Sequence, residues 1–218
     1  ISDSCQPIGA EQESFKSGSI ADITAFSFYA TKNITCGEGG ILTTNNEDYE
    51  KKARLFRQHG RSDLNNYDYT HIGYNYRTTD INASILLEQL KKLSDFTNKR
   101  ISNANYLLEN LKDIPGLVLP KTFKNNKHVF HQFTIKINSD FKMRRDDLVK
   151  YFKDKGINCG VYYPKSIHLF DHLIKFGYQE GDFPVAERLS GEVISLPVHP
   201  ELSRDDLNYI VSSINGVI

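Results

Sequence analysis

The pattern of apolar and polar positions predicts strands and a helix in the first third of the chain. A β-branched and aromatic run at 23–28 and an apolar run at 39–44 predict two strands. Residues 46–60 predict a helix, because this charged segment is acidic at its start and ends at a glycine. The polar stretch 61–77, rich in Tyr and Asn, predicts a loop.

The strongest helical periodicity lies in the middle of the chain. Apolar residues recur at helical spacing over 81–111, and Pro115-Gly116 marks the end of the pattern. A helix of roughly thirty residues is long for a globular protein, so it either bends or connects two domains. We therefore expect domains at 1–95 and 96–218.

Strands and helices alternate through the rest of the chain. The expected strands are 128–137, 159–163 and 193–198, and the expected helices are 144–156, 184–190 and 203–214. The last helix opens with the Ser-x-x-Asp pattern of a capping box. This alternation predicts an α+β C-terminal domain, and we expect the chain as a whole to belong to the α/β class.

Composition and charge narrow the class of function. Lys+Arg and Asp+Glu both number 27, so the formal net charge is zero and gives no signal for nucleic-acid binding. No apolar run approaches the length of a membrane span. Three widely spaced cysteines, Cys5, Cys36 and Cys159, are typical of free thiols in a reducing cytoplasm. We expect a cytoplasmic protein without nucleic-acid or membrane partners.

A lone lysine, Lys32, stands between the predicted strand 23–28 and a glycine-rich stretch. It is either a solvated loop lysine or a lysine that forms a Schiff base with pyridoxal phosphate. That chemistry also requires a carboxylate beside the pyridinium nitrogen. Asp3 suits this role, because "ISDSCQ" reads as the end of another strand and such ends meet at one edge of an α/β sheet.

Several strings carry a resemblance to a known family. "DITAFSFYATKNITCGEGGILTT" closely resembles the Schiff-base segment of the DegT/DnrJ/EryC1/StrS sugar aminotransferases. "SDSCQPIGA", "HIGYNYRTTDINASILLEQLKKL" and "GVYYPKSIHL" resemble further motifs of that family. The resemblance implies part of the large domain of a PLP-dependent transferase with the aspartate aminotransferase-like fold, followed by a smaller α+β domain. The segment that precedes the Asp3 motif in the family is missing from the sequence.

The resemblance also implies the residues of a pyridoxal 5'-phosphate site. Lys32 would be catalytic through its Schiff base, and Asp3 would pair with the pyridine nitrogen. Gln6 would lie against the 3'-oxygen of the ring, and Ser27 would bind the phosphate.

Other family residues imply a site shared between subunits of a homodimer. Asn75 would contact the cofactor phosphate of the other subunit, with Arg77 near the substrate there. His168 would face the sugar nucleotide from the C-terminal domain. Two positions depart from the family pattern, since Tyr162 replaces a frequent His and Ser2 replaces a usual Glu.

A lysine at position 32 implies transamination, because the dehydratase branch of the family has histidine there. The implied reaction moves an amino group, with glutamate as the expected donor, to a nucleotide-linked keto-sugar in polysaccharide biosynthesis. "GEGG" at 37–40 resembles the 4-keto branch. Two alternatives remain: a truncated, non-catalytic dimerising module of the same fold, and a PLP/PMP-dependent sugar dehydratase.

Two further residue groups have competing interpretations. His168 and His172 are four residues apart and could bind a metal from one helix face. No third ligand is visible in the sequence, so we expect no metal. The tyrosines at positions 67, 69, 74 and 76 could stack on a nucleotide base or pack across a dimer interface.

Overall fold

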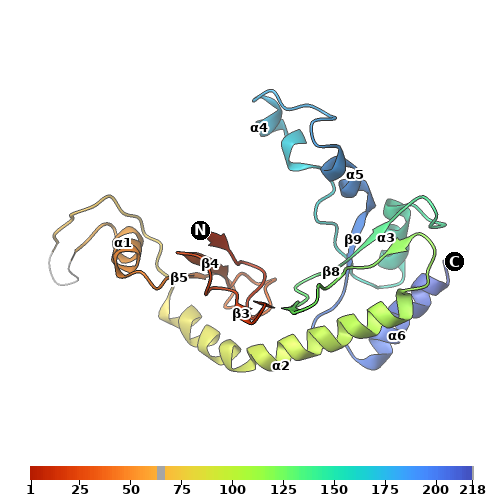
Figure 1. The fold of residues 1–218 in the computed structure, drawn as a ribbon, viewed down its shortest axis with the longest axis horizontal. Helices are drawn as coiled ribbons and strands as arrows, with labels where there is room; N and C mark the ends of the chain where they lie inside the picture. Colours follow the sequence, from red (N-terminus) through yellow and green to blue (C-terminus); the bar gives the residue numbers. More distant parts are fainter. Residues whose placement is uncertain (63–66, 218) are drawn as a thin grey trace. The chain divides into compact units, whose positions relative to one another are not determined.

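The computed structural model describes residues 1–62 and 67–217, and these form two compact units. The first unit comprises 1–98 with 122–131, and the second comprises 99–121 with 132–218. Helix α2, Asp80–Leu111, contributes to both units and is drawn in yellow to green in Figure 1. Its 32 residues confirm the single long helix expected from the periodicity. The division of the chain into domains at 1–95 and 96–218 stays a prediction.

A three-stranded sheet with the order β1-β4-β5 organises the first unit. Its strands are β1 (Ser2–Asp3), β4 (Thr24–Ser27) and β5 (Gly40–Thr43), which confirms the strands predicted within 23–28 and 39–44. β1 runs parallel to β4, with Asp3 opposite Ala25, whereas β5 is antiparallel to β4. The carboxyl ends of β1 and β4 therefore meet at one edge of the sheet.

The core of the first unit packs around the end of β4. β4 alternates buried and half-buried residues, as expected for a strand with one covered face. The buried cluster consists of Phe26, Phe28, Ile34 and Cys36, with Ile8, Leu86, Leu93 and Phe96 packed against it. Because three of these apolar side chains come from α2, the first half of the long helix supports the segment that follows β4.

The first unit also contains one predicted helix and one unpredicted sheet. Helix α1, Glu47–Arg57, begins after Asn46, whose side chain accepts hydrogen bonds from two backbone amides. The second sheet has the order β3-β2-β7 and consists of Phe15–Lys16, Glu11–Gln12 and Asn126–Lys127. Strands of two residues carry no detectable alternation, so the sequence pattern could not predict them.

The second unit has the α+β organisation that the sequence predicted. Its antiparallel sheet has the order β6-β8-β9, formed by Leu117–Val118, Phe133–Ile137 and Val193–Leu196. The helices are α3 (Arg145–Asp154), η1 (Ile167–Leu169), α4 (Asp171–Ile174), α5 (Pro184–Glu192) and α6 (Arg204–Asn215). The predicted capping box at Ser203 is confirmed. The fully buried side chains of the second unit include Leu107, Leu111, Phe133, Phe152 and Ile194.

Two strand predictions were wrong in extent. The segment predicted as strand from 128 becomes β8 only at Phe133, because the chain turns at Phe130, which has a φ of 42°. The ring of His128 accepts the amide of Phe130 at 2.9 Å and stabilises this turn. The segment 159–163 contributes only an isolated bridge between Gly160 and Ser195, after which the chain leaves the sheet.

The described residues also bear on the cysteines and on membrane insertion. Cys5, Cys36 and Cys159 are free thiols, as expected from their spacing. Within 1–62 and 67–217, none of the helices combines the length and the apolar character needed to cross a bilayer.

Candidate active site

Lys32 lies on a tightly hydrogen-bonded turn after β4. Its amide donates to the carbonyl of Tyr29 at 2.9 Å. Thr35 donates its hydroxyl to the carbonyl of Phe28 at 2.9 Å and accepts from the amide of Gly37 at the same distance. Lys32 itself is half-buried. The backbone that bears the lysine is therefore defined by hydrogen bonds within the turn.

Asn33, next to Lys32, anchors this turn to a distant segment. Its side chain is buried; Nδ2 donates to the carbonyl of Val129 at 3.4 Å, and Oδ1 contacts Nδ1 of His131 at 3.2 Å. Ile34, the next residue, is 0% exposed. The sequence analysis did not single out Asn33. The local sequence gives only a weak signal for such an anchor, namely a polar residue between Lys32 and an apolar position.

Asp3 is held as a carboxylate at the end of β1. The amide of Cys5 donates to its Oδ1 at 3.0 Å. Hydrogen bonding by the side chain and amide of Cys5, with a smaller contribution from the charge of Lys32, lowers the pKa of Asp3 below its usual value. The same contact raises the pKa of the Cys5 thiol, so at neutral pH the thiol stays protonated and the carboxylate ionised. Asp3 and Lys32 therefore lie within electrostatic range of each other.

Ser27 and Gln6 lie near the same edge of the sheet. Ser27 is the last residue of β4, and its half-buried hydroxyl oxygen accepts from the amide of Tyr29 at 3.3 Å. Gln6 is exposed and follows β1 by three residues. The parallel pairing of β1 with β4 thus places four predicted residues, Asp3, Gln6, Ser27 and Lys32, at or just beyond two neighbouring strand ends.

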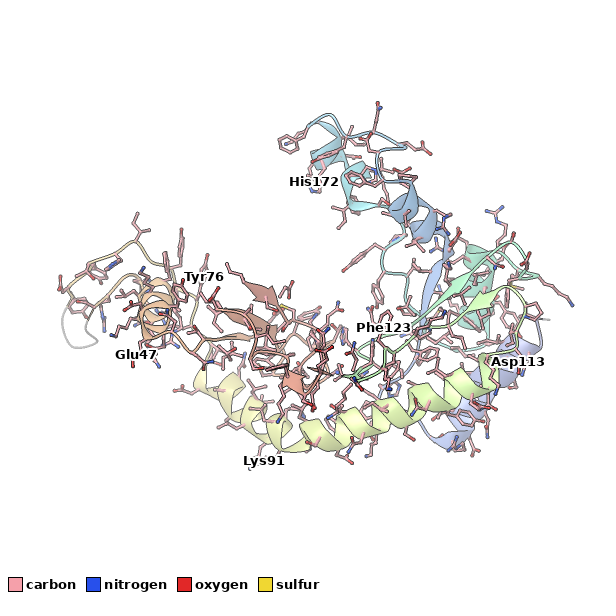
Figure 2. All side chains as sticks on the ribbon, in the orientation of Figure 1. Glu47, Tyr76, Lys91, Asp113, Phe123 and His172 are labelled. Atoms are coloured by element: carbon pink, nitrogen blue, oxygen red, sulfur yellow. The ribbon has the colours of Figure 1, made fainter. Side chains whose placement is uncertain are left out.

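Asn75 and Arg77 belong to a second cluster of the first unit, built against the end of α1. Backbone hydrogen bonds join 74–76 to this helix end, including Tyr74 amide to Phe56 carbonyl at 2.7 Å and Tyr76 amide to Arg57 carbonyl at 3.1 Å. Figure 2 labels Tyr76 on this segment and Glu47 at the start of α1. Part of the predicted loop 61–77, namely 63–66, lies outside the described residues.

A close approach of two glycines permits this arrangement. Gly60 has a φ of 73°, and a Cβ there would lie 1.7 Å from the carbonyl oxygen of His71. A Cβ on Gly73 would lie 2.0 Å from the nitrogen of Gly60. Only glycine fits at either position, because real Cβ atoms do not approach backbone atoms so closely.

His168 is buried within the second unit and bonded to a carboxylate. Its ring is 8% exposed, and Nε2 lies 2.9 Å from Oε1 of Glu187. Phe183 packs edge-on against the imidazole at 4.7 Å between ring centroids. The amide of Gly181, then that of Phe183 and the ring of His168, lower the pKa of Glu187. The contact of His168 with a sugar nucleotide stays a prediction.

The described residues hold no grouping of three or more His, Cys, Asp or Glu side chains suited to a metal ion. His168 lies in η1 and is bonded to Glu187, whereas His172, labelled in Figure 2, is exposed in α4. The two histidines therefore belong to different helical elements rather than to one helix face.

Comparison with known proteins identifies the family. The DegT/DnrJ/EryC1/StrS aminotransferase family matches residues 1–215. The chain belongs to this family.

Individual relatives agree with the family assignment. The chain is 37% identical to the uncharacterized protein MJ1066 of Methanocaldococcus jannaschii, covering 100% of this chain and 59% of the relative. It is 34% identical to UDP-N-acetyl-3-dehydro-alpha-D-glucosamine 3-aminotransferase of Acidithiobacillus ferrooxidans, covering 100% and 57%. The DegT-family chain thus spans less than two thirds of either relative.

A solved structure supports the fold. The putative sugar aminotransferase Spr1654 of Streptococcus pneumoniae, in its PMP form, superposes with a TM-score of 0.91 at 26% identity. The superposition covers 99% of this chain and 56% of that one. The expected fold class, part of the aspartate aminotransferase-like PLP-dependent transferases, is confirmed.

Proposed function

We propose that this DegT-family chain carries the catalytic lysine of a PLP-dependent sugar aminotransferase. The ionised carboxylate of Asp3, within electrostatic range of Lys32 at two parallel strand ends, carries this proposal. The proposed reaction moves an amino group from glutamate to a nucleotide-linked keto-sugar. The free thiols favour a cytoplasmic location, where such thiols stay reduced.

The chemistry of the donor set fits pyridoxal phosphate. An ionised Asp3 suits the protonated pyridine nitrogen, and Gln6 would lie against the 3'-oxygen. The hydroxyl oxygen of Ser27 accepts from the amide of Tyr29, which leaves its proton to donate to the phosphate. When bound, the cofactor supplies an electron sink for the carbon that loses a proton.

Lys32 performs two tasks in this proposal. Its Nζ would hold the cofactor covalently, and its free amine would carry a proton to or from the α-carbon of the amino donor. The hydrogen bonds of the turn and the buried Asn33 restrict where the base of the lysine side chain can lie. A lysine at this position favours transamination over the dehydratase alternative.

The proposal also assigns contacts with the cofactor phosphate and the substrate to single residues. Asn75 would bind the cofactor phosphate of a second subunit in a homodimer, and the guanidinium of Arg77 suits the diphosphate of a sugar nucleotide. His168 would face the sugar. The name of the Acidithiobacillus relative supports a nucleotide-sugar substrate with a 3-amino product. The glycine-rich stretch at 37–40 favours a 4-keto substrate instead. A transamination assay should therefore include both the 3-keto and the 4-keto sugar nucleotide.

The decisive variants are Lys32→Ala and Lys32→Arg in the complete gene product. We expect the absorbance of the bound cofactor to change when glutamate is added to the unaltered protein. Both variants should slow this half-reaction by about 10²-fold or more, because they remove the acid–base group. A Lys32→Ala protein that transaminates normally would overturn the proposal. A folded, colourless unaltered protein would instead support the non-catalytic dimerising module.

A further inference from the structure

The guanidinium of Arg77 is already oriented by two neutral side chains. Its Nη1 donates to Oε1 of Gln58 at 3.0 Å and lies 2.9 Å from Nε2 of His59. A guanidinium has donors only, so His59 must present a lone pair at Nε2. The imidazole in this contact is therefore neutral and carries its proton on Nδ1.

This arrangement leaves a particular part of Arg77 available. Both contacts are made by Nη1, so the edge formed by Nε and Nη2 stays available as a pair of parallel donors. Paired donors of this kind bind phosphate oxygens in bidentate fashion. Because both acceptors are neutral, they orient the guanidinium without cancelling the positive charge that a diphosphate requires. A carboxylate in their place would compete with the substrate.

The backbone fixes the two acceptors opposite Arg77. Gln58 forms a bridge with Asn75, and the amide of His59 donates to the carbonyl of Tyr74 at 2.9 Å. His59 has a φ of 58°, a conformation that histidine adopts more readily than most residues. The end of α1 is thus joined by backbone hydrogen bonds to the segment that bears Asn75 and Arg77.

We infer that His59, together with Gln58, is a positioning residue that presents the Nε–Nη2 edge of Arg77 to the diphosphate of a nucleotide sugar. This inference rests on the proposed function. Freeing the guanidinium would add the cost of immobilising one long side chain to substrate binding. The expected consequence is a rise of about three- to tenfold in KM for the nucleotide sugar.

The test uses His59→Phe and His59→Gln in the complete, cofactor-loaded protein. Both substitutes are unbranched at Cβ, so the strain at φ 58° is similar, but only glutamine retains a neutral acceptor. UDP, dTDP and GDP serve as binding probes, and the keto-sugar of whichever nucleotide binds serves as substrate. His59→Phe should raise the nucleotide Kd and the sugar KM by about three- to tenfold, with a smaller change in KM for glutamate. His59→Gln should restore most of the loss.

A double-mutant cycle with Arg77→Gln separates positioning from general damage. In the Arg77→Gln background, His59→Phe should change nucleotide binding by less than about twofold, because the guanidinium that it orients is gone. An undiminished effect in that background, or equal losses for phenylalanine and glutamine, would overturn the inference. So would an Arg77→Gln protein with unaltered nucleotide affinity, but the role of Lys32 would survive. If the Lys32 variants carried out the glutamate half-reaction at the normal rate, the proposed function would be overturned, whatever the nucleotide affinities are.

Discussion

The Lys32 turn and the Arg77 segment, both in the first unit, are positioned in different ways. The Lys32 turn rests on a buried core, with Ile34 at 0% and Phe28 at 3% exposure, and is anchored by the side chain of Asn33. The Arg77 segment is exposed, with Tyr76 at 69%, and is joined to α1 by backbone hydrogen bonds. The first arrangement suits a group that must hold one geometry for chemistry. The second suits a surface that is completed when a substrate or a second subunit binds.

The largest expected effect on stability comes from substituting Gly60, whose backbone lies very close to the carbonyl of His71. Gly60→Ala forces a Cβ against the carbonyl of His71 and adds the strain of a positive φ, at a cost of about 3 kcal/mol. Gly156→Ala is a matched control, because Gly156 has the same φ of 73° and a methyl group added there would meet nothing within 4 Å. Urea unfolding should show a loss of about 1 kcal/mol for the control. Equal losses for the two variants would show that the close approach has no energetic consequence.

Asn33→Ala tests the buried anchor of the Lys32 turn. The substitution leaves the carbonyl of Val129 and the ring of His131 without this partner, which should cost about 1–3 kcal/mol. The glutamate half-reaction should also slow, because the lysine is less well positioned. Asn45→Ala, at an exposed position in the same unit, should stay within about 0.5 kcal/mol of the unaltered protein. A loss of stability with an unchanged half-reaction would restrict Asn33 to a structural role.

A smaller effect concerns the charge of Asp3. Its folded pKa lies below the ordinary 3.8, so its contribution to stability is present above that pH and is lost as the pH falls through the lowered pKa. Asp3→Asn should remove this part of the acid dependence of unfolding, with a small loss of stability at pH 7 and nearly unchanged stability below the lowered pKa. Identical acid profiles for the two proteins would show that the contacts with Cys5 and Lys32 do not favour the ionised form.

The sequence predicted features that depend on local pattern. The alternation in β4 and the helical periodicity of α2 were sufficient to find both elements, and the family motifs led to Lys32, Asp3 and Arg77 as site candidates. The turn at Phe130 was hidden, because a run of β-forming residues gives no signal for a positive φ.

Features that depend on long-range contacts could not be predicted. Asn33 meets Val129 across 96 residues of sequence, and His59 meets Arg77 across 18. The bond between His168 and Glu187 likewise joins two separate elements. None of these pairs has a characteristic spacing, so only the folded chain reveals that each polar side chain has a partner.

The covalent role of Lys32 is the central claim and has a direct test. The complete protein, purified with its cofactor, would be reduced with borohydride, digested and mapped by mass spectrometry. The account predicts a pyridoxyl adduct on Lys32. An adduct on a different lysine, or none on a folded protein supplied with pyridoxal phosphate, would contradict it.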